Sequence, residues 1–338
     1  MVYALERLNI SGNDWPAKID IKLAGTIYQT PAWLAFLSIT QSGEPVVAAL
    51  KEGRRTLGYF TGLIVQKFGV RILGSPFPGW STDYMGFSLS ERADRRQAVL
   101  ALMDFAFQEL GCVHLEIMDR KIAVSDLRGL RIQHRVYRGF EIDLTPSENE
   151  LFSNMTSACR RCVRKAEKEG VLVEEAHDLE FADEYYAQLK DVFGKQNLVP
   201  TYDIERVRQL IQHVYPTGHL LLLRARDRLG RCIATGIFPH MNGVMYFWGG
   251  ASWRQHQLLR PNEAIQWHAM KIGKQRGLRV YDMGGGGEYK RKYGGSEIAV
   301  PWLRKSKYPW VQYLRDTAQR SYKMSRESLG RFNRLLAR

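Results

Sequence analysis

Apolar and polar residues follow the same order of expected elements in each half of the chain. In the first half, short apolar runs separated by glycines and polar turns predict three strands, at 46–50, 57–65 and 70–73. Residues 94–110 then carry apolar side chains at helical spacing, and Gly111 stands where a helix favours its end. A buried strand follows at 112–118.

The second half repeats this order. Three apolar runs, joined by the turn-rich segments R-D-R-L-G and H-M-N-G, predict antiparallel strands at 219–225, 232–238 and 244–248. A helix is expected from Asn262, as its N-cap, to Gly277, and the strand L-R-V-Y-D-M comes next. Before these elements the pattern predicts a strand at 171–176 and two amphipathic helices, at 181–193 and 203–214.

The two helix ends align without a gap. Gly111 precedes Glu116 by five residues, and Gly277 precedes Asp282 by the same spacing, so each half carries an acid at one place on the strand. We infer an internal duplication with an offset of 166 residues between the two glycines. The predicted organisation is a first domain at 1–145, a second at 146–308 and a basic helical tail at 309–338.

Composition limits the classes of protein that fit. The 338 residues are 45% hydrophobic and 25% charged, which is an ordinary globular composition. No basic segment followed by an apolar run begins the chain, and no apolar stretch is long enough for a spanning helix, so we expect a cytoplasmic protein. Four irregularly spaced cysteines fit a reducing compartment. We expect no metal site.

The formal net charge of +14 calls for an anionic partner. Lysine and arginine concentrate at 160–168 and at 304–338. Nucleic acid, a nucleotide-linked substrate and an anionic membrane surface all fit this charge, and so does a basic protein that is merely soluble. The tail mixes arginines with leucines and aromatic residues; it could lie on the inner face of a membrane, dock on the protein or fray.

The order strand, two helices, three antiparallel strands, helix, strand is similar to the GNAT acyltransferase fold. Its duplication resembles the Fem family of peptidoglycan-bridge aminoacyltransferases and their acetyltransferase-like relatives. The segments that carry the resemblance are F-E-I-D-L, R-R-C-V-R-K-A-E-K-E-G-V-L-V, W-G-G-A-S, R-P-N-E-A-I-Q-W, Y-D-M-G-G and Y-K-R-K-Y-G-G, in the order of the family. The resemblance implies an α/β fold with a mixed sheet and two tandem GNAT-like domains, followed by the basic helix.

The donor is the main point on which the chain departs from a CoA-dependent GNAT enzyme. Such an enzyme binds pyrophosphate on a glycine-rich loop that opens a helix. Here the corresponding segment, 251–262, contains no glycine, and Pro261 has no N–H group. The resemblance therefore favours aminoacyl-tRNA as the co-substrate, with acyl-CoA as the alternative and no permanently bound cofactor.

The glycine loop at 284–295 is the expected centre of the chemistry. Lys290 would project a cation toward a carbonyl oxygen or phosphate, or it would be a solvated side chain of a surface hairpin. Asp282 would accept the proton of an attacking amine or orient the ammonium, or it would cap the loop through the N–H groups of Gly284 and Gly285. Glu263 is expected to complement the helix dipole.

Further residues are predicted to bind substrate. Arg160, Arg161 and Arg164 share a helix face and could clamp phosphates, or form a solvated face paired with neighbouring glutamates. Trp248 could line an acceptor groove or pack in the core. The motifs of the second half add six residues: Asn262, Tyr281, Gly285, Tyr289, Tyr293 and Gly294.

The predicted function is transfer of an acyl or aminoacyl group to an amine of a cell-envelope precursor, which would be nucleotide-linked or lipid-linked. Direct attack without a covalent enzyme intermediate is expected, because no Cys-His or Ser-His pairing is evident in the sequence. Two alternatives stay open. One is an acetyl-CoA-dependent N-acetyltransferase acting on a sugar or polysaccharide precursor, and the other is a non-catalytic RNA-binding protein. The sequence does not determine the oligomeric state.

Overall fold

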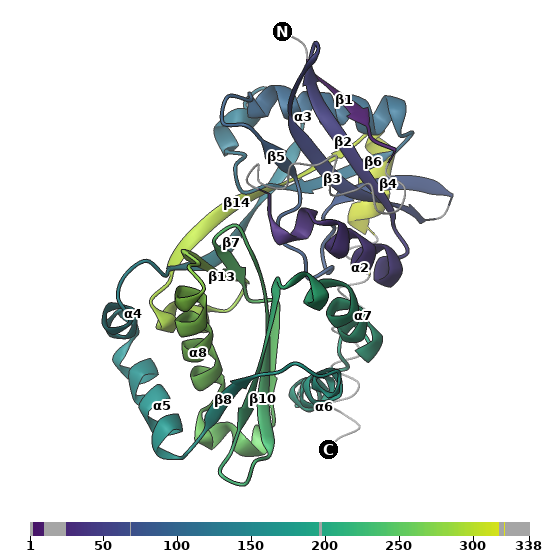
Figure 1. Ribbon diagram of the computed structural model, residues 1–338. Coiled ribbons are helices and arrows are strands. Elements are labelled where there is room, and N and C mark those ends of the chain that lie inside the picture. Colours follow the sequence, from purple (N-terminus) through teal and green to yellow (C-terminus); the bar gives the residue numbers. More distant parts are fainter. Residues whose placement is uncertain (1–2, 10–24, 68, 196–197, 318–320, 322–338) are drawn as a thin grey trace. The chain divides into compact units, whose positions relative to one another are not determined.

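The computed structural model describes residues 3–9, 25–67, 69–195, 198–317 and 321. These residues divide into two compact units (Figure 1). The first unit holds the chain up to Tyr137 together with the residues from Ala299 onward, and the second unit holds 138–298.

The first unit is built on a mixed sheet. Its strands follow one another across the sheet in the order β1 (Tyr3–Arg7), β2 (Glu44–Glu52), β3 (Arg55–Lys67), β4 (Val70–Ser75), β6 (His114–Met118) and β14 (Ser296–Ser306). The short strand β5 (Phe87–Leu89) pairs with β3. β4 and β6 run parallel to each other, and the other neighbours of this unit pair antiparallel.

Two helices of the first unit begin at side-chain caps. Thr30 accepts a hydrogen bond from the Trp33 N–H at the start of α2 (Pro31–Gln41), with proline in the first helical position. Asp94 accepts from the Gln97 N–H at the start of α3 (Arg95–Asp104). A π-helical turn, Phe105–Glu109, continues α3, so the helix predicted at 94–110 is confirmed. The apolar pattern of the sequence did not predict α2.

The second unit has helices on both faces of its sheet. The strand order is β7 (Gln133–Asp143), β13 (Val280–Gly285), β11 (Val244–Tyr246), β10 (Cys232–Met241), β9 (Leu220–Arg226) and β8 (Leu172–Glu175), and β12 (Gly249–Ser252) also pairs with β10. In Figure 1 one side of the sheet carries α5 (Ser157–Lys168) and α8 (Pro261–Gln275) and the other α6 (Glu180–Gly194) and α7 (Ile204–Val214). The short helix α4 (Glu148–Asn154) precedes α5.

The turn H-M-N-G shows why the predicted hairpin forms. Asn242 and Gly243 both have positive φ angles, +48° and +79°, as a tight hairpin between β10 and β11 requires. Asparagine and glycine tolerate this conformation better than other residues do.

Strand pairing supports the inferred duplication. In the first unit Glu116 lies on β6, opposite Gly74 of a parallel neighbour and Arg304 of an antiparallel one. In the second unit Asp282 lies on β13, opposite Tyr246 of a parallel neighbour and Glu141 of an antiparallel one. The two acids therefore occupy equivalent strands, and the predicted α/β architecture of two tandem GNAT-like units is confirmed.

The unit boundaries differ from those expected from the sequence. The first division falls after Tyr137 and not after residue 145, because the following residues of β7 pair with β13. Residues 299–317 belong to the first unit, because β14 pairs with β6. Of the predicted tail at 309–338, residues 309–317 are helical, whereas 318–320 and 322–338 lie outside the described residues.

Each unit has its own apolar core. In the first unit, Leu50, Phe60 and Leu102 lie in one cluster, and in the second unit Leu223, Phe238 and Met270 lie in another. In the described part of the chain, no helix is long and apolar enough to cross a membrane.

A buried histidine makes the stability of the first unit depend on pH. His114 is 1% exposed, and its ring nitrogens contact Ser306 Oγ at 2.8 Å and Glu116 Oε1 at 3.2 Å. Burial, reinforced by the charges of Arg315 and Arg304, lowers the pKa of His114 to about 3. In an unfolded chain the pKa of histidine is about 6.5, so below that pH the unfolded state binds a proton that the folded state does not.

We therefore expect the stability that His114 provides to be complete above about pH 6.5 and to be lost as the pH falls toward 3. Between pH 7 and pH 5 the loss is about 2 kcal/mol. His114→Gln should remove this part of the pH dependence in urea unfolding, whereas His134→Gln, which replaces an exposed histidine, should not. Equal pH slopes for the wild type and His114→Gln would contradict the assignment.

Candidate active site

The sheet of the second unit splits where the sequence predicts one continuous strand. The run expected at 244–248 breaks into β11 and β12, because parallel pairing with β13 ends at Tyr246 and Asp282. The Phe247 N–H still donates to the Asp282 carbonyl at 2.8 Å, and the chain then turns to follow β10. Among the described strands, β12 pairs with β10 alone, so its other edge has no strand partner.

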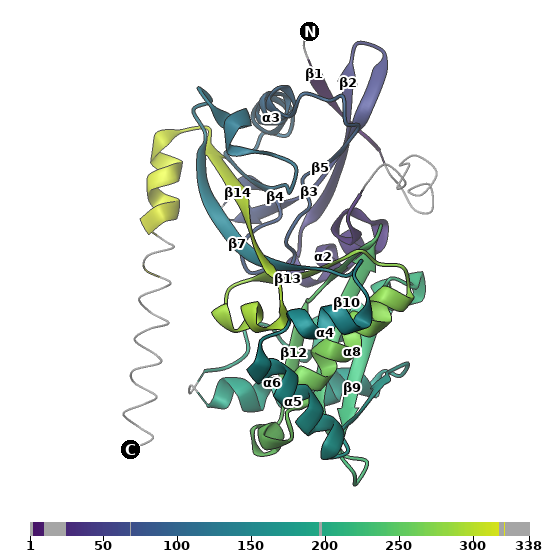
Figure 2. The same ribbon diagram turned by 90° about the vertical axis from the view of Figure 1, so that its left-hand side faces the viewer.

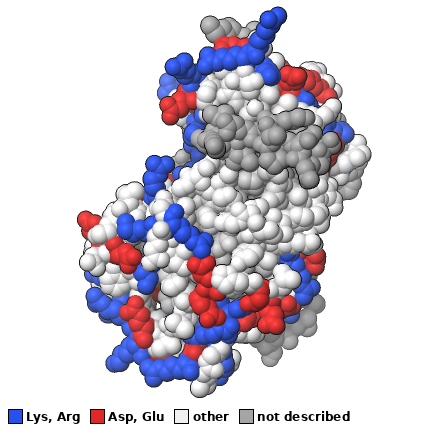
Figure 3. Space-filling view, viewed as in Figure 1, with Lys and Arg blue, Asp and Glu red and all other residues white. Residues whose placement is uncertain are grey.

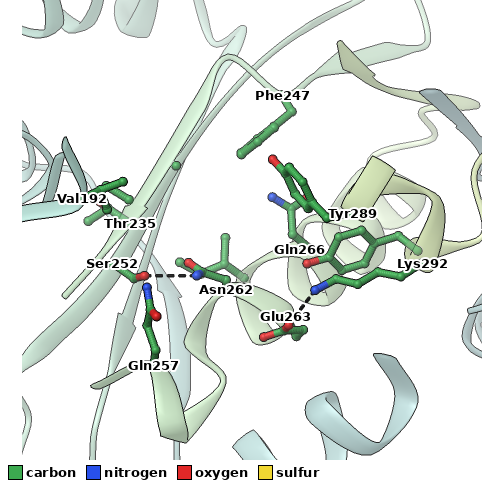
Figure 4. A pocket seen from close by; sticks show the side chains of 14 residues that line it. Val192, Thr235, Phe247, Ser252, Gln257, Asn262, Glu263, Gln266, Tyr289 and Lys292 are labelled. Carbon is green, nitrogen blue, oxygen red and sulfur yellow. Dashed lines mark hydrogen bonds and ion pairs between the residues drawn. The ribbon is translucent and has the colours of Figure 1, made fainter. Parts of the chain in front are cut away.

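A pocket of about 240 Å³ lies beside this split. Its walls come mainly from β12, from the first turns of α8 and from the 3-10 helix η7 (Glu288–Tyr293) that follows β13. Single residues of α6, of β10, of the segment between β11 and β12 and of the 3-10 helix before α8 complete the lining. The side chains are drawn in Figure 4. The polar side chains of the lining include Ser252, Asn262, Glu263, Gln266, Tyr289, Lys292 and Tyr293.

The N-terminus of α8 opens onto the pocket with little capacity for an anion. Pro261 occupies the first helical position, and Arg260 precedes it with a φ of +61°. Asn262, expected as the N-cap, is instead the second helical residue, because proline's fixed φ suits the first position. Its side-chain amide donates to Ser252 Oγ at 3.0 Å and ties the helix to β12 (Figure 4).

A partly buried ion pair forms one wall of the pocket. Glu263 is 8% exposed, and its carboxylate accepts a hydrogen bond from Lys292 Nζ at 2.7 Å (Figure 4). A carboxylate buried to this extent is stable when a cation pairs with it. Glu263 therefore does more than complement the helix dipole, the role expected from the sequence.

The two residues expected to be catalytic are buried beside the pocket and are absent from its lining. Lys290 Nζ donates to the carbonyls of Met283, at 2.5 Å, and Gly285, at 2.8 Å. The Asp282 carboxylate accepts from the Gly284 N–H at 2.7 Å, which is the capping alternative considered above. The geometry thus differs from the expected projection of Lys290 toward a ligand, since the backbone carbonyls of the loop hold its ammonium.

Gly294 and Gly285 serve the backbone of this loop. Gly294 has a φ of +87°, and a Cβ atom there would come within 2.9 Å of the Asn154 carbonyl oxygen. The Lys292 carbonyl accepts from the Thr156 N–H at 2.9 Å. The close approach fixes η7 against the junction of α4 and α5, so the loop has a defined position and is no free hairpin.

Three tyrosines near the pocket are hydrogen-bond donors at neutral pH. Burial raises the pKa of Tyr281 and of Tyr293 well above the usual range, with nearby negative charge adding to both. Burial also raises the pKa of Tyr289. Tyr281 donates to Gln266 Oε1 at 2.5 Å beneath the pocket, whereas Tyr289 and Tyr293 line it.

Trp248 belongs to an aromatic cluster on the α6 side of β12. Its ring lies 5.7 Å from that of Tyr202 and 6.4 Å from that of Tyr185, and the two tyrosine hydroxyls share a hydrogen bond of 2.8 Å. A Cβ atom at Gly249 would lie 2.4 Å from the Tyr185 hydroxyl. The cluster supports β12 from behind, a role closer to packing than to the expected acceptor groove.

The basic residues of α5 lie away from the pocket lining. Arg160 donates to the carbonyls of Ser153 and Met155 and so caps α4. Arg164 lies over the ring of Phe152 at 5.3 Å, and Arg161 is exposed. On the face of the second unit drawn in Figure 3, lysine and arginine alternate with aspartate and glutamate. This mixed surface favours the alternative in which the basic residues of α5 form a solvated helix face and not a phosphate clamp.

Sequence reasoning placed Asn262, Tyr289 and Tyr293 in the site and missed Lys292 and Gln266 as lining residues. Gln266 had a usable signal, because it follows Glu263 by three residues on one helix face. The conformation of η7 decides whether Lys290 or Lys292 enters the pocket. No pattern in the sequence predicts that conformation. Among the described residues, no group of three or more histidines, cysteines or acids is arranged to hold a metal ion.

A family model described as an acetyltransferase (GNAT) domain matches residues 153–292. The match covers less than half of the chain and lies within the second unit, so it identifies a GNAT-type domain there. Curated protein sequences give no match. A domain of this type supports an acyltransferase activity.

Solved structures share the fold over most of the chain. FemX is 15% identical with a TM-score of 0.69, over 88% of this chain and 96% of that one. The structure of L-PGS from Bacillus licheniformis is 11% identical with a TM-score of 0.53, over 86% and 96%. A tandem GNAT protein from the clavulanic acid biosynthesis pathway is 8% identical with a TM-score of 0.53, over 91% and 99%. At these identities the likeness concerns the fold.

The buried contacts of Lys290 generate a stability prediction. Lys290→Met keeps the apolar stem and removes the donor of two carbonyls, so we expect the free energy of unfolding to fall by about 1–3 kcal/mol. Arg291→Met, in the same turn, removes ion pairs of a 55% exposed side chain and should cost less than about 1 kcal/mol. Urea unfolding measures both. Equal small losses would show that the loop does not depend on Lys290.

Proposed function

We propose that the second unit transfers an acyl or aminoacyl group to an amine of a cell-envelope precursor in the cytoplasm, with the pocket between β12, α8 and η7 as the reaction site. The observation that carries the proposal is the Glu263–Lys292 pair in a pocket beside a split sheet. The strand edge of β12 offers backbone groups to an extended donor, and the pair offers a base and an acid within 2.7 Å of each other.

The proposed reaction needs both members of the pair. The amine nitrogen attacks the acyl carbonyl carbon, and a C–N bond forms as the bond from that carbon to the donor's oxygen or sulfur breaks. Glu263 accepts the proton that the amine loses, and Lys292 gives a proton to the leaving group. Proton transfer within the pair then restores the starting state. The tyrosine hydroxyls of the lining donate hydrogen bonds to the developing oxyanion.

Asp282 and Lys290 act in this proposal as positioning residues. Both bind the backbone of the segment that leads from β13 into η7. The same segment carries Tyr289 and Lys292 into the pocket. Substitution of either residue should therefore displace η7. We expect the rate of transfer to fall as a result, because catalysis is sensitive to small displacements of the reacting groups.

The N-terminus of α8 favours aminoacyl-tRNA over acyl-CoA as the donor. A pyrophosphate at this helix end would meet a proline without an N–H group and the carboxylate of Glu263. An aminoacyl ester bears an ammonium group and no pyrophosphate near its reacting carbon, so it fits this charge better. Acetyl-CoA stays the second candidate donor, because the matching family is described as an acetyltransferase domain.

Two of the structures with this fold support a cell-envelope acceptor: FemX, a Fem-like protein, and L-PGS. A precursor amine would approach the pocket from its open side, where Tyr289 is 55% exposed.

The test compares donors and a matched pair of glutamate variants. Purified protein is incubated with candidate amine acceptors and either charged tRNA or acetyl-CoA, and product is read as a mass shift of the acceptor. We expect a product with charged tRNA, and Glu263→Gln should lower kcat by about a hundredfold or more. Glu288→Gln is the control, since Glu288 lies in η7 but is 79% exposed and outside the pocket lining.

If product formed with acetyl-CoA and not with charged tRNA, the donor would be acetyl-CoA and the proposed reaction site would be unchanged. Activity of Glu263→Gln within about twofold of the wild type would remove Glu263 from the proton transfer. Absence of product from both donors with every amine tried, in a protein that binds tRNA, would favour the RNA-binding alternative over the transfer reaction proposed here.

A further inference from the structure

The helix at 309–317 in the first unit packs with its polar side inward. Figure 2 draws it in yellow after β14. Asp316 pairs with Arg304 at 3.1 Å and accepts from Gln312, which in turn accepts from Ser306. Arg315 forms an ion pair with Glu116, whose side chain is 3% exposed. A short polar stripe therefore holds the helix to the rest of the unit.

The opposite side of the same helix is apolar and open to solvent. Trp310, Tyr313 and Leu314 are 56%, 73% and 57% exposed. Their spacing of three and four residues places them on one face, about half a turn from Gln312, Arg315 and Asp316. Surface helices ordinarily turn the apolar stripe to the core and the polar stripe to water. The reversed arrangement indicates that something other than water covers the apolar face.

The residues that precede this face extend it. Tyr308 is 43% exposed, and its ring stacks on that of Trp310 with centroids 6.1 Å apart and planes within 8°. Lys307 Nζ lies 5.8 Å from the centre of the Tyr308 ring. Tryptophan and tyrosine beside lysine are the side chains that occupy the boundary between lipid headgroups and acyl chains.

The positive charge of the chain favours an anionic partner for this apolar face. The sequence after Thr317 contains six basic residues, Arg320, Lys323, Arg326, Arg331, Arg334 and Arg338, against one acid, Glu327. A second copy of this chain, with its formal net charge of +14, would be repelled by that charge. An anionic lipid surface is attracted by it and accepts the apolar side chains as well. A nucleic acid would satisfy the charge but leaves Leu314 without a partner.

We propose that the face formed by Tyr308, Trp310, Tyr313 and Leu314 binds the surface of bilayers that contain anionic lipid. The contact is peripheral: the aromatic side chains enter the headgroup region, and Lys307, beside Tyr308, contacts lipid phosphate. The ion pair between Arg315 and Glu116 keeps the face turned outward. This proposal concerns the first unit and is independent of the reaction proposed for the second.

Co-sedimentation of the full chain with vesicles tests the proposal. We expect binding to vesicles of phosphatidylcholine mixed with phosphatidylglycerol, weaker binding to pure phosphatidylcholine, and a decrease with added salt. The combined variant Trp310→Ser, Tyr313→Ser and Leu314→Ser should bind the mixed vesicles at least about tenfold less tightly. The control, Leu229→Ser with Leu258→Ser, removes leucines that are 75% and 72% exposed in the second unit and should bind as the wild type does.

A second readout does not rely on the triple variant folding. Brominated lipid in the mixed vesicles should quench more tryptophan emission in the wild type than in Trp310→Phe, because Trp310 reaches the bromine. Three results would overturn the proposal: no binding of the wild type to the mixed vesicles, equal binding of the triple variant, or equal quenching in Trp310→Phe. Loss of self-association or RNA binding in the triple variant, with vesicle binding unchanged, would reassign the face to that partner.

Discussion

The end of parallel pairing between β11 and β13, at Tyr246 and Asp282, is the constraint on which the candidate site depends. Up to Tyr246 and Asp282 the two strands are hydrogen-bonded to each other. Beyond it β12 follows β10, and β13 leads into its own loop. The pocket occupies the space between the diverging strands, and most of its lining comes from β12, from α8 and from η7, which follows β13.

Buried charges keep this divergence open and ordered. Lys290 and Asp282 bind the backbone of the β13 loop, and the Glu263–Lys292 pair joins that loop to α8. Asn262 joins α8 to β12. These three links use side chains from different parts of the sequence to hold two strand ends apart. The first unit has an acid on the equivalent strand, Glu116, but there it binds a histidine and an arginine.

The order of elements, the duplication and the glycine loop could be predicted from the sequence because each follows from local pattern: apolar spacing, glycine after a helix, and hairpin turns. The sheet split could not, since Phe247 and Trp248 continue an apolar run and only tertiary pairing ends the strand. The roles of Lys290 and Lys292 were also beyond local pattern. They lie two residues apart in one turn, and one binds backbone carbonyls while the other faces a buried glutamate.

The central claim is that acyl transfer takes place in the pocket between β12, α8 and η7. A crystal structure of the protein with a non-hydrolysable analogue of an aminoacyl-tRNA 3′ end tests it most directly. The account predicts density for the acyl group along the free edge of β12, with its carbonyl carbon within reach of the Glu263–Lys292 pair. Density for the analogue elsewhere in the chain, with this pocket empty, would contradict it.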